Sequence, residues 1–146
     1  MSESMIFEFL DTTVDELHTT DAYSIMHDRT VEEAFEMMKE NHAGYLLVID
    51  RSINLLGILT ERDLIHKAFG SSDLLKKTVS SVMTKNPVTI GGNESVAVAL
   101  QEMNHREFHH LPVIDMAGKP IGIIAISDIN DRKHDQLALS QLNQQL

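Results

Sequence analysis

The sequence predicts an α+β protein built from two tandem copies of one strand–helix–strand–strand–helix unit. The chain matches itself without a gap when it is displaced by 65 positions, so that Leu46, Val48 and Asp50 fall on Leu111, Val113 and Asp115. Each copy has a helical stripe of apolar residues, followed by two short apolar runs around a polar turn. A single copy has too few strands to cover both faces of a sheet. We therefore expect the copies to pack sheet to sheet with pseudo-two-fold symmetry.

Each predicted element follows from the spacing of apolar and turn residues. The first copy contains an extended segment (Tyr23-Ser24-Ile25), a helical stripe (Val31, Ala34, Phe35, Met38), strands at Tyr45–Ile49 and Leu55–Leu59, and a helix from Thr60 to about Phe69. Thr30 and Glu33 form a capping box, which predicts that the first helix starts at Val31. The second copy contains Val88-Thr89-Ile90, the stripe Val96, Ala99, Leu100 and Met103, and strands at Leu111–Ile114 and Ile121–Ile126.

The repeat divides the chain into four parts. We expect an N-terminal extension over residues 1–12, a first copy with its linker over 13–77, a second copy over 78–131 and a tail over 132–146. The tail is rich in glutamine and carries Leu137, Leu139, Leu142 and Leu146. This pattern fits either a short helix that packs on a partner subunit or a frayed chain end.

Composition excludes several classes of protein. The 146 residues include no cysteine, which rules out disulfides, thiol catalysis and zinc–thiolate sites. Twelve basic residues face 22 acidic ones, and the resulting net charge of −10 disfavours duplex nucleic acid and anionic membranes as partners. The apolar runs are too short to span a membrane, and the first residues lack the features of a secretory signal. We expect a cytoplasmic protein without membrane insertion.

The ordered motifs resemble a known family. Leu46-Leu47-Val48-Ile49-Asp50 is followed by Gly57-Ile58-Leu59-Thr60 and Asp63-Leu64, and the second copy has His109-His110-Leu111-Pro112-Val113 after an opening Val82-Met83-Thr84. This set is similar to a tandem CBS-domain pair, or Bateman module, and the resemblance covers about residues 13–131. It implies a stand-alone regulatory module, because the chain has no room for an attached enzyme, channel or transporter domain.

The resemblance also implies two pseudo-symmetric clefts between the repeats that bind adenosyl ligands. AMP, ADP, ATP and S-adenosylmethionine are the usual ligands of such modules, with NADH and cyclic dinucleotides in some, and no cofactor is required. Two pairs commonly form a disc-shaped homodimer of four repeats that acts on an effector protein.

The start of the second helix is the predicted binding element. A helix that begins near Thr60 has unpaired N–H groups and a positive dipole end, which favour phosphate, while Asp63 can accept from both ribose hydroxyls. Alternatively, Thr60 is only an N-cap and Asp63 only interacts with the helix dipole. Carried over from the family, cleft A contains Thr60, Arg62, Asp63, Thr78, Val82, Met83, His109, His110 and Leu111. Cleft B contains Thr13, Leu17, His18, Gly44, Tyr45, Ser127 and Asp128.

Cleft B departs from the family pattern. Ala125 stands where the first copy has Thr60, so a hydroxyl contact is missing, and we expect cleft A to be the better nucleotide site. The His105/His109 spacing is compatible with a metal site, but no acidic or cysteine ligand lies at a suitable spacing, and no metal is expected. The sequence has no catalytic motif, which indicates a protein that is not an enzyme. A dimerising interaction module that binds no nucleotide is the alternative to an adenine-nucleotide sensor.

Overall fold

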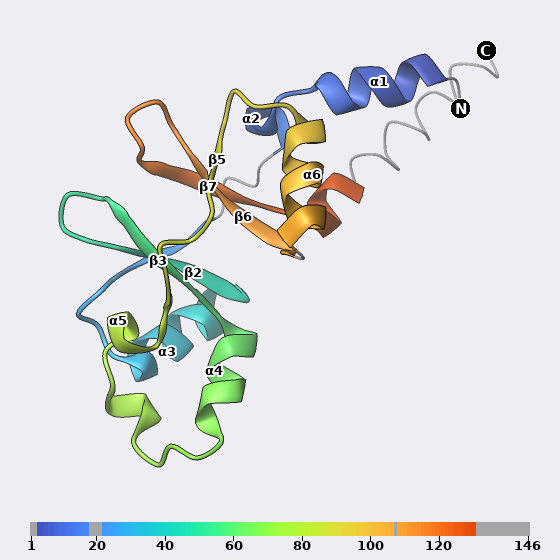
Figure 1. Ribbon diagram of the computed structural model, residues 1–146. Coiled ribbons are helices and arrows are strands. Elements are labelled where there is room, and N and C mark those ends of the chain that lie inside the picture. Colours follow the sequence, from blue (N-terminus) through green and yellow to red (C-terminus); the bar gives the residue numbers. More distant parts are fainter. Residues whose placement is uncertain (1–2, 18–21, 107, 131–146) are drawn as a thin grey trace. The chain divides into compact units, whose positions relative to one another are not determined.

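A computed structural model describes residues 3–17, 22–106 and 108–130 (Figure 1). The protein is a mixed α+β chain with a four-stranded sheet and a three-stranded sheet. The predicted tail over 132–146 lies outside the described residues. The described chain forms two compact units. Among the described residues, unit 1 holds 3–17, 89–106, 108–115 and 121–130, and unit 2 holds 22–88 and 116–120.

The first sequence copy has the predicted order of elements. It runs through β1 (Ser24–Met26), α3 (Val31–Asn41), β2 (Tyr45–Ile49), β3 (Leu55–Thr60) and α4 (Glu61–Ala68). The strand β1 lies one residue later than predicted. The polar turn between β2 and β3 is held by the Asp50 carboxylate, which accepts from the N–H groups of Ser52 and Asn54 at 2.9 Å each.

The helix α3 starts at Val31, as its capping box predicts. Thr30 Oγ1 accepts from the Glu33 N–H at 3.2 Å, and the Thr30 hydroxyl donates to Glu33 Oε1 at 3.4 Å. The helix ends at Asn41, and its C-cap residue His42 has a φ of 51°, in the left-handed region that closes many helices. The local sequence therefore sets both ends of α3.

Replacing the capping residue of α3 tests this assignment. We expect Thr30→Ala to lower the free energy of unfolding by about 1 kcal/mol, because an N–H of the first turn loses its acceptor. Urea unfolding monitored by circular dichroism measures the loss. Ser72→Ala is the control, since Ser72 is exposed in the loop after α4. Equal stability of Thr30→Ala and Ser72→Ala would show that the cap contributes nothing.

The second copy repeats the same order. It contains β5 (Ile90–Gly91), α6 (Val96–Arg106), β6 (His110–Ile114) and β7 (Pro120–Ala125), and residues 126–130 are helical. Ser95 stands at the position of Thr30, and its Oγ accepts from the Val98 N–H at 3.2 Å. The predicted strand at Ile121–Ile126 is wrong at its last residue. Ile126 begins the helix, and its N–H donates to His109 O at 2.9 Å.

Each sheet begins with a parallel pair of strands. The four-stranded sheet has the order β1-β2-β3-β4, where β1 runs parallel to β2 and the other neighbours are antiparallel; the three-stranded sheet has the order β5-β6-β7. The parallel pairs arise because a helix, α3 or α6, connects their strands as a crossover. The predicted sheet-to-sheet packing of the copies stays a prediction.

The first segment of each sequence copy belongs to the compact unit that holds the rest of the other copy. Thr13 forms a bridge with Ser95, next to α2 (Val14–Leu17), and Thr78 forms a bridge with Thr30, next to α5 (Val79–Val82). In unit 1, α1 (Glu3–Asp11) also packs against α6. In unit 2, β4 (Thr84–Lys85) adds the last strand, and η1 (Leu74–Lys76) contacts α3. Each compact unit therefore contains most of one sequence copy together with the initial segment of the other copy.

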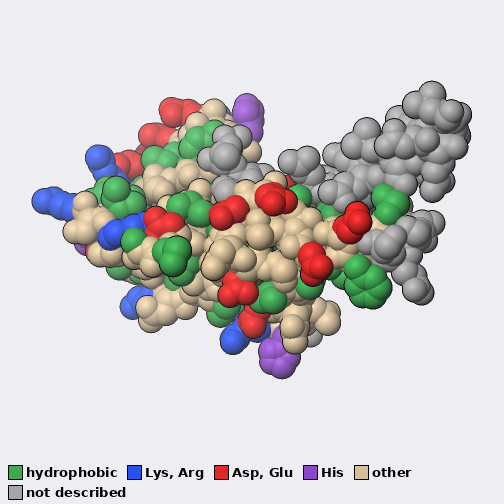
Figure 2. All heavy atoms as spheres, turned by 90° about the horizontal axis from the view of Figure 1, so that it is seen from above, with side chains coloured by type: hydrophobic (Ala, Val, Ile, Leu, Met, Phe, Trp, Pro, Cys, Tyr) green, Lys and Arg blue, Asp and Glu red, His purple; other side chains and the backbone are tan. Residues whose placement is uncertain are grey.

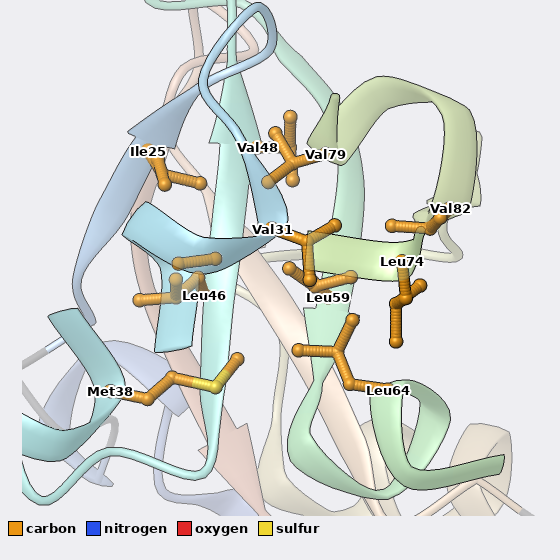
Figure 3. Packing of buried hydrophobic residues seen from close by; sticks show 11 residues of the cluster. Ile25, Val31, Met38, Leu46, Val48, Leu59, Leu64, Leu74, Val79 and Val82 are labelled. Carbon is orange, nitrogen blue, oxygen red and sulfur yellow. The ribbon is translucent and has the colours of Figure 1, made fainter. Parts of the chain in front are cut away.

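The core of unit 2 lies between its sheet and the helices α3, α4 and α5 (Figure 3). Leu46 and Val48 of β2 and Leu59 of β3 face Val31 of α3 and Leu64 of α4, and all five side chains are completely buried. The cluster consists of Ile25, Val31, Ala34, Met38, Leu46, Val48, Leu59, Leu64, Leu74, Val79 and Val82. This packing fixes the junction of β3 and α4, where the candidate site lies.

Candidate functional site

The junction between β3 and α4 is held in place by the neighbouring hairpin strand. Thr60 ends β3 opposite Tyr45 of β2 and is the N-cap of α4, with its Oγ1 accepting from the Asp63 N–H at 3.1 Å. The Glu61 N–H donates to Gly44 O at 2.8 Å. Gly44 and Tyr45, predicted for cleft B, therefore lie beside Thr60 of cleft A in the same unit.

The first turn of α4 differs from the sequence expectation in one respect. Unpaired N–H groups were expected there, but those of Glu61 and Asp63 already have acceptors in Gly44 O and Thr60 Oγ1. At most the Arg62 N–H is left for a ligand. The sequence did not indicate this, because Gly44 lies on the far strand of the hairpin.

The Asp63 carboxylate is free to bind. It is half-buried, and it makes no hydrogen bond or ion pair with any residue in the described part of the chain. Thr60 uses its hydroxyl oxygen as an acceptor and keeps its proton for donation. Arg62, on the same turn, is exposed. This turn offers a carboxylate acceptor, a hydroxyl donor and one exposed guanidinium.

The linker residues predicted for cleft A belong to unit 2 as well. Val82 is 5% exposed and is part of the core cluster, while Met83 is partly buried against that cluster. Thr78 is exposed, with its Oγ1 3.2 Å from Ser80 Oγ. Lys67, which the sequence analysis did not single out, donates from its Nζ to Val82 O and ties α4 to α5. A lone lysine late in a helix gives no sequence signal for such a contact.

The second copy uses its equivalent aspartate differently. Asp128 Oδ2 accepts from the Ala125 N–H at 3.1 Å and so caps the helix that starts at residue 126. In the first copy the Thr60 hydroxyl accepts from the Asp63 N–H, whereas in the second copy Ala125 has no hydroxyl and the Asp128 carboxylate accepts from the Ala125 N–H instead. Ser127 is exposed on the same turn. The two aspartates are therefore at equivalent positions in the sequence, but only the Asp63 carboxylate has no hydrogen-bond partner among the described residues.

The histidines predicted for cleft A lie in unit 1. His110 and Leu111 are in β6, where Leu111 is completely buried and His110 is half-buried, and His109 precedes them and is exposed. Burial lowers the pKa of His110, the charge of His109 lowers it further, and Asp128 opposes this. The lowered pKa favours the neutral imidazole at neutral pH.

The remaining predicted residues also divide between the units. Thr13 is paired with Ser95, and Leu17 is 7% exposed, both in unit 1. His18 lies outside the described residues. Both predicted clefts thus draw residues from both units, and the grouping of these residues into shared clefts stays a prediction.

The described ranges contain neither a metal-binding cluster nor a membrane-spanning helix. No group of three or more His, Asp or Glu side chains there is arranged to hold a metal ion. None of the helices described here combines the length and apolar character needed to cross a membrane.

The arrangement of two βαββα copies with a capped second helix defines the class of protein. The family model for the CBS domain matches residues 14–70 and 79–135. The chain therefore belongs to the CBS-domain family, in a tandem arrangement.

Individual relatives agree with this assignment. An uncharacterized 17.7 kDa protein of Acidianus ambivalens is 37% identical over 118 residues, which make up 81% of this chain and 71% of that protein. The chain spans only 23% of the length of the next curated relatives, which are larger Arabidopsis thaliana CBS domain-containing proteins.

Two solved structures of similar fold contain ligands. CBSX2 of Arabidopsis thaliana in complex with AMP has a TM-score of 0.74 and 25% identity, covering 84% of this chain and 96% of that one. The CBS domain pair of protein MJ0100, in complex with 5′-methylthioadenosine and S-adenosyl-L-methionine, has a TM-score of 0.75 and 25% identity, covering 86% and 98%.

Proposed function

We propose that this chain is a non-enzymatic regulatory module that binds an adenosyl compound at the start of α4. The observation that carries the proposal is the free, half-buried carboxylate of Asp63 on a helix start capped by Thr60. A carboxylate in this position accepts hydrogen bonds from the two ribose hydroxyls, as acidic residues do in dinucleotide-binding folds. AMP, ATP and S-adenosylmethionine are the candidate ligands, and similar structures bind AMP or S-adenosyl-L-methionine.

The rest of the site follows from the family resemblance. In this proposal Thr78, Val82 and Met83 border the ligand in unit 2, and His109, His110 and Leu111 of unit 1 complete cleft A. A homodimer in the cytoplasm passes the binding signal to an effector protein. The energy available for that signal is the difference in ligand affinity between the two states of the module.

Cleft B is proposed as a weaker site. Its members are Thr13, Leu17, His18, Gly44, Tyr45, Ser127 and Asp128. Its carboxylate already accepts from the Ala125 N–H, so ribose hydroxyls compete with the helix cap for Asp128.

Replacing Asp63 tests the primary site. We expect Asp63→Ala to weaken binding of the tightest adenosyl ligand at least about tenfold in calorimetric titration, because a charged hydrogen-bond acceptor is lost. The melting temperature without ligand should stay unchanged, since this carboxylate has no partner in the described residues.

Asp128→Ala is the matched control. It should lower the melting temperature without ligand, because the Ala125 N–H loses its acceptor, and leave the tightest binding event in place. An affinity loss in Asp128→Ala equal to that in Asp63→Ala would contradict the assignment of the primary site.

A module that binds no nucleotide is the second candidate function. It is favoured by two exposed apolar side chains, Ile65 on α4 at 53% and Phe69 directly after that helix at 83%. The absence of any heat signal with AMP, ADP, ATP, S-adenosylmethionine, NADH and cyclic di-AMP would support this function over the first.

A further inference from the structure

The backbone donors at the start of α4 are largely used within the protein. Helix starts bind phosphate through several free N–H groups that converge on the anion. Here the Glu61 N–H is directed to Gly44 O at 2.8 Å and the Asp63 N–H to Thr60 Oγ1 at 3.1 Å. At most one donor, the Arg62 N–H, is left in this turn. The helix start is therefore poorly equipped to hold a chain of phosphates.

The side-chain charges in this turn also oppose phosphate. Glu61 is exposed and Asp63 half-buried, so this turn itself carries two carboxylates and one guanidinium, that of Arg62. Lys39 and His42 line a hollow together with Glu61. Lys67, on the last turn of α4, donates to Val82 O. The whole chain carries a net charge of −10, and acidic side chains are scattered over the face seen in Figure 2. Each added phosphate charge is repelled by this field.

The same groups suit an uncharged or positively charged ligand. The Asp63 carboxylate can accept from ribose hydroxyls whatever the 5′ substituent is. A sulfonium group near Glu61 would gain from the carboxylate, and a thioether would neither gain nor lose. In this arrangement the nucleoside part of the ligand is recognised by hydrogen bonds, and the charge of its 5′ group decides whether the carboxylates of this turn strengthen or weaken binding.

We propose that this site selects adenosyl compounds with an uncharged or cationic 5′ group over adenine nucleotides with several phosphates. The inference rests on the proposed function, because it describes the selectivity of the same site. It is specific to the first copy. The corresponding turn of the second copy has Ile126 and Ser127 in place of Glu61 and Arg62, and it has neither of their charges.

Calorimetric titration with five compounds tests the selectivity. The compounds are 5′-methylthioadenosine, S-adenosylmethionine, AMP, ADP and ATP, each measured with EDTA at low and at high salt. We expect methylthioadenosine and S-adenosylmethionine to bind at least about tenfold more tightly than ATP at low salt. The ratio should shrink at high salt because screening weakens the repulsion.

Two variants separate the local charge from the global one. Glu61→Gln removes a carboxylate from the same helix turn as Asp63, while Glu36→Gln removes an equal charge from an exposed position on α3. The measured quantity is the ratio of the affinity for methylthioadenosine to the affinity for ATP. We expect Glu61→Gln to lower this ratio at least about threefold and Glu36→Gln to leave it unchanged. Equal ratios in the wild type and in Glu61→Gln would overturn the inference.

The outcomes distinguish this inference from the proposed function. Binding in which ATP equals or exceeds methylthioadenosine would overturn the selectivity and leave the adenosyl site standing. No binding of any of the five compounds would overturn the proposed function, and the selectivity with it. A preference for the two thio compounds that Glu61→Gln reduces would support both.

Discussion

Leu59→Ala is expected to lower the free energy of unfolding by about 2–5 kcal/mol. The Leu59 side chain is completely buried in the core of unit 2, one residue before the candidate site, and lies close to Val31 and Leu64 (Figure 3). The substitution removes buried apolar area and leaves a cavity, because strands and helices on every side restrict relaxation. Folded domains have only about 5–15 kcal/mol of stability in total, so the loss is a large fraction.

Urea unfolding with an unchanged m-value is the measurement for this substitution. Ile65→Ala is the control, since it removes a similar amount of side chain from a position on α4 that is 53% exposed. The control should change the free energy of unfolding by no more than about 0.5 kcal/mol. A loss below about 1 kcal/mol for Leu59→Ala would contradict the close packing of the cluster.

The elements of this fold could be predicted because their signals are local. The capping box at Thr30 and Glu33 fixes the start of α3 within four residues of sequence, and the structure confirms it. Short apolar runs around a polar turn likewise give β2 at its observed bounds, Tyr45–Ile49. Repetition of the pattern after 65 residues then gives the tandem arrangement. Periodicity and turn chemistry were sufficient at this level.

The exchange of segments between the copies could not be predicted, because it depends on distant contacts. Thr13 pairs with Ser95 and Thr78 with Thr30, and neither pair leaves a pattern within one stretch of sequence. Self-comparison groups residues by similarity, so it assigns Thr78 to the copy that follows it in the chain. Contact between residues separated by dozens of positions decides the compact unit instead.

The sequence indicated which residues to consider for the candidate site, but not which of their groups are already hydrogen-bonded within the protein. The motif singled out Asp63 and Asp128 as equivalents, and the missing hydroxyl at Ala125 was visible in the sequence. The different use of the two carboxylates was not visible: Asp128 accepts from the Ala125 N–H, while the Asp63 carboxylate has no partner in the described residues. The occupied N–H of Glu61 was missed for the same reason, because its acceptor lies across the hairpin.

Gly57→Ala is expected to lower the free energy of unfolding by about 3 kcal/mol, because β3 and β4 lie too close for a side chain at this position. A Cβ at Gly57 would lie 2.6 Å from Thr84 O and would also collide with the Met83 side chain. Met83 has a flexible side chain that can rotate away. Thr84 O belongs to the backbone of β4, which pairs with β3 at Gly57 and Ile58.

Relief of this collision therefore requires β4 to move, and with it the linker residues proposed to border the ligand. Gly44→Ala is the matched control, since a Cβ there has nothing within 4 Å, and it should leave stability nearly unchanged. Thermal unfolding of both variants gives the comparison, and a Gly57→Ala protein as stable as Gly44→Ala would contradict the close approach of β3 and β4. Met83 lies against Gly57, and Asp63 is in the first turn of α4, the helix that follows β3. Gly57→Ala should therefore also weaken binding of the adenosyl ligand without changing any group that recognises the ribose.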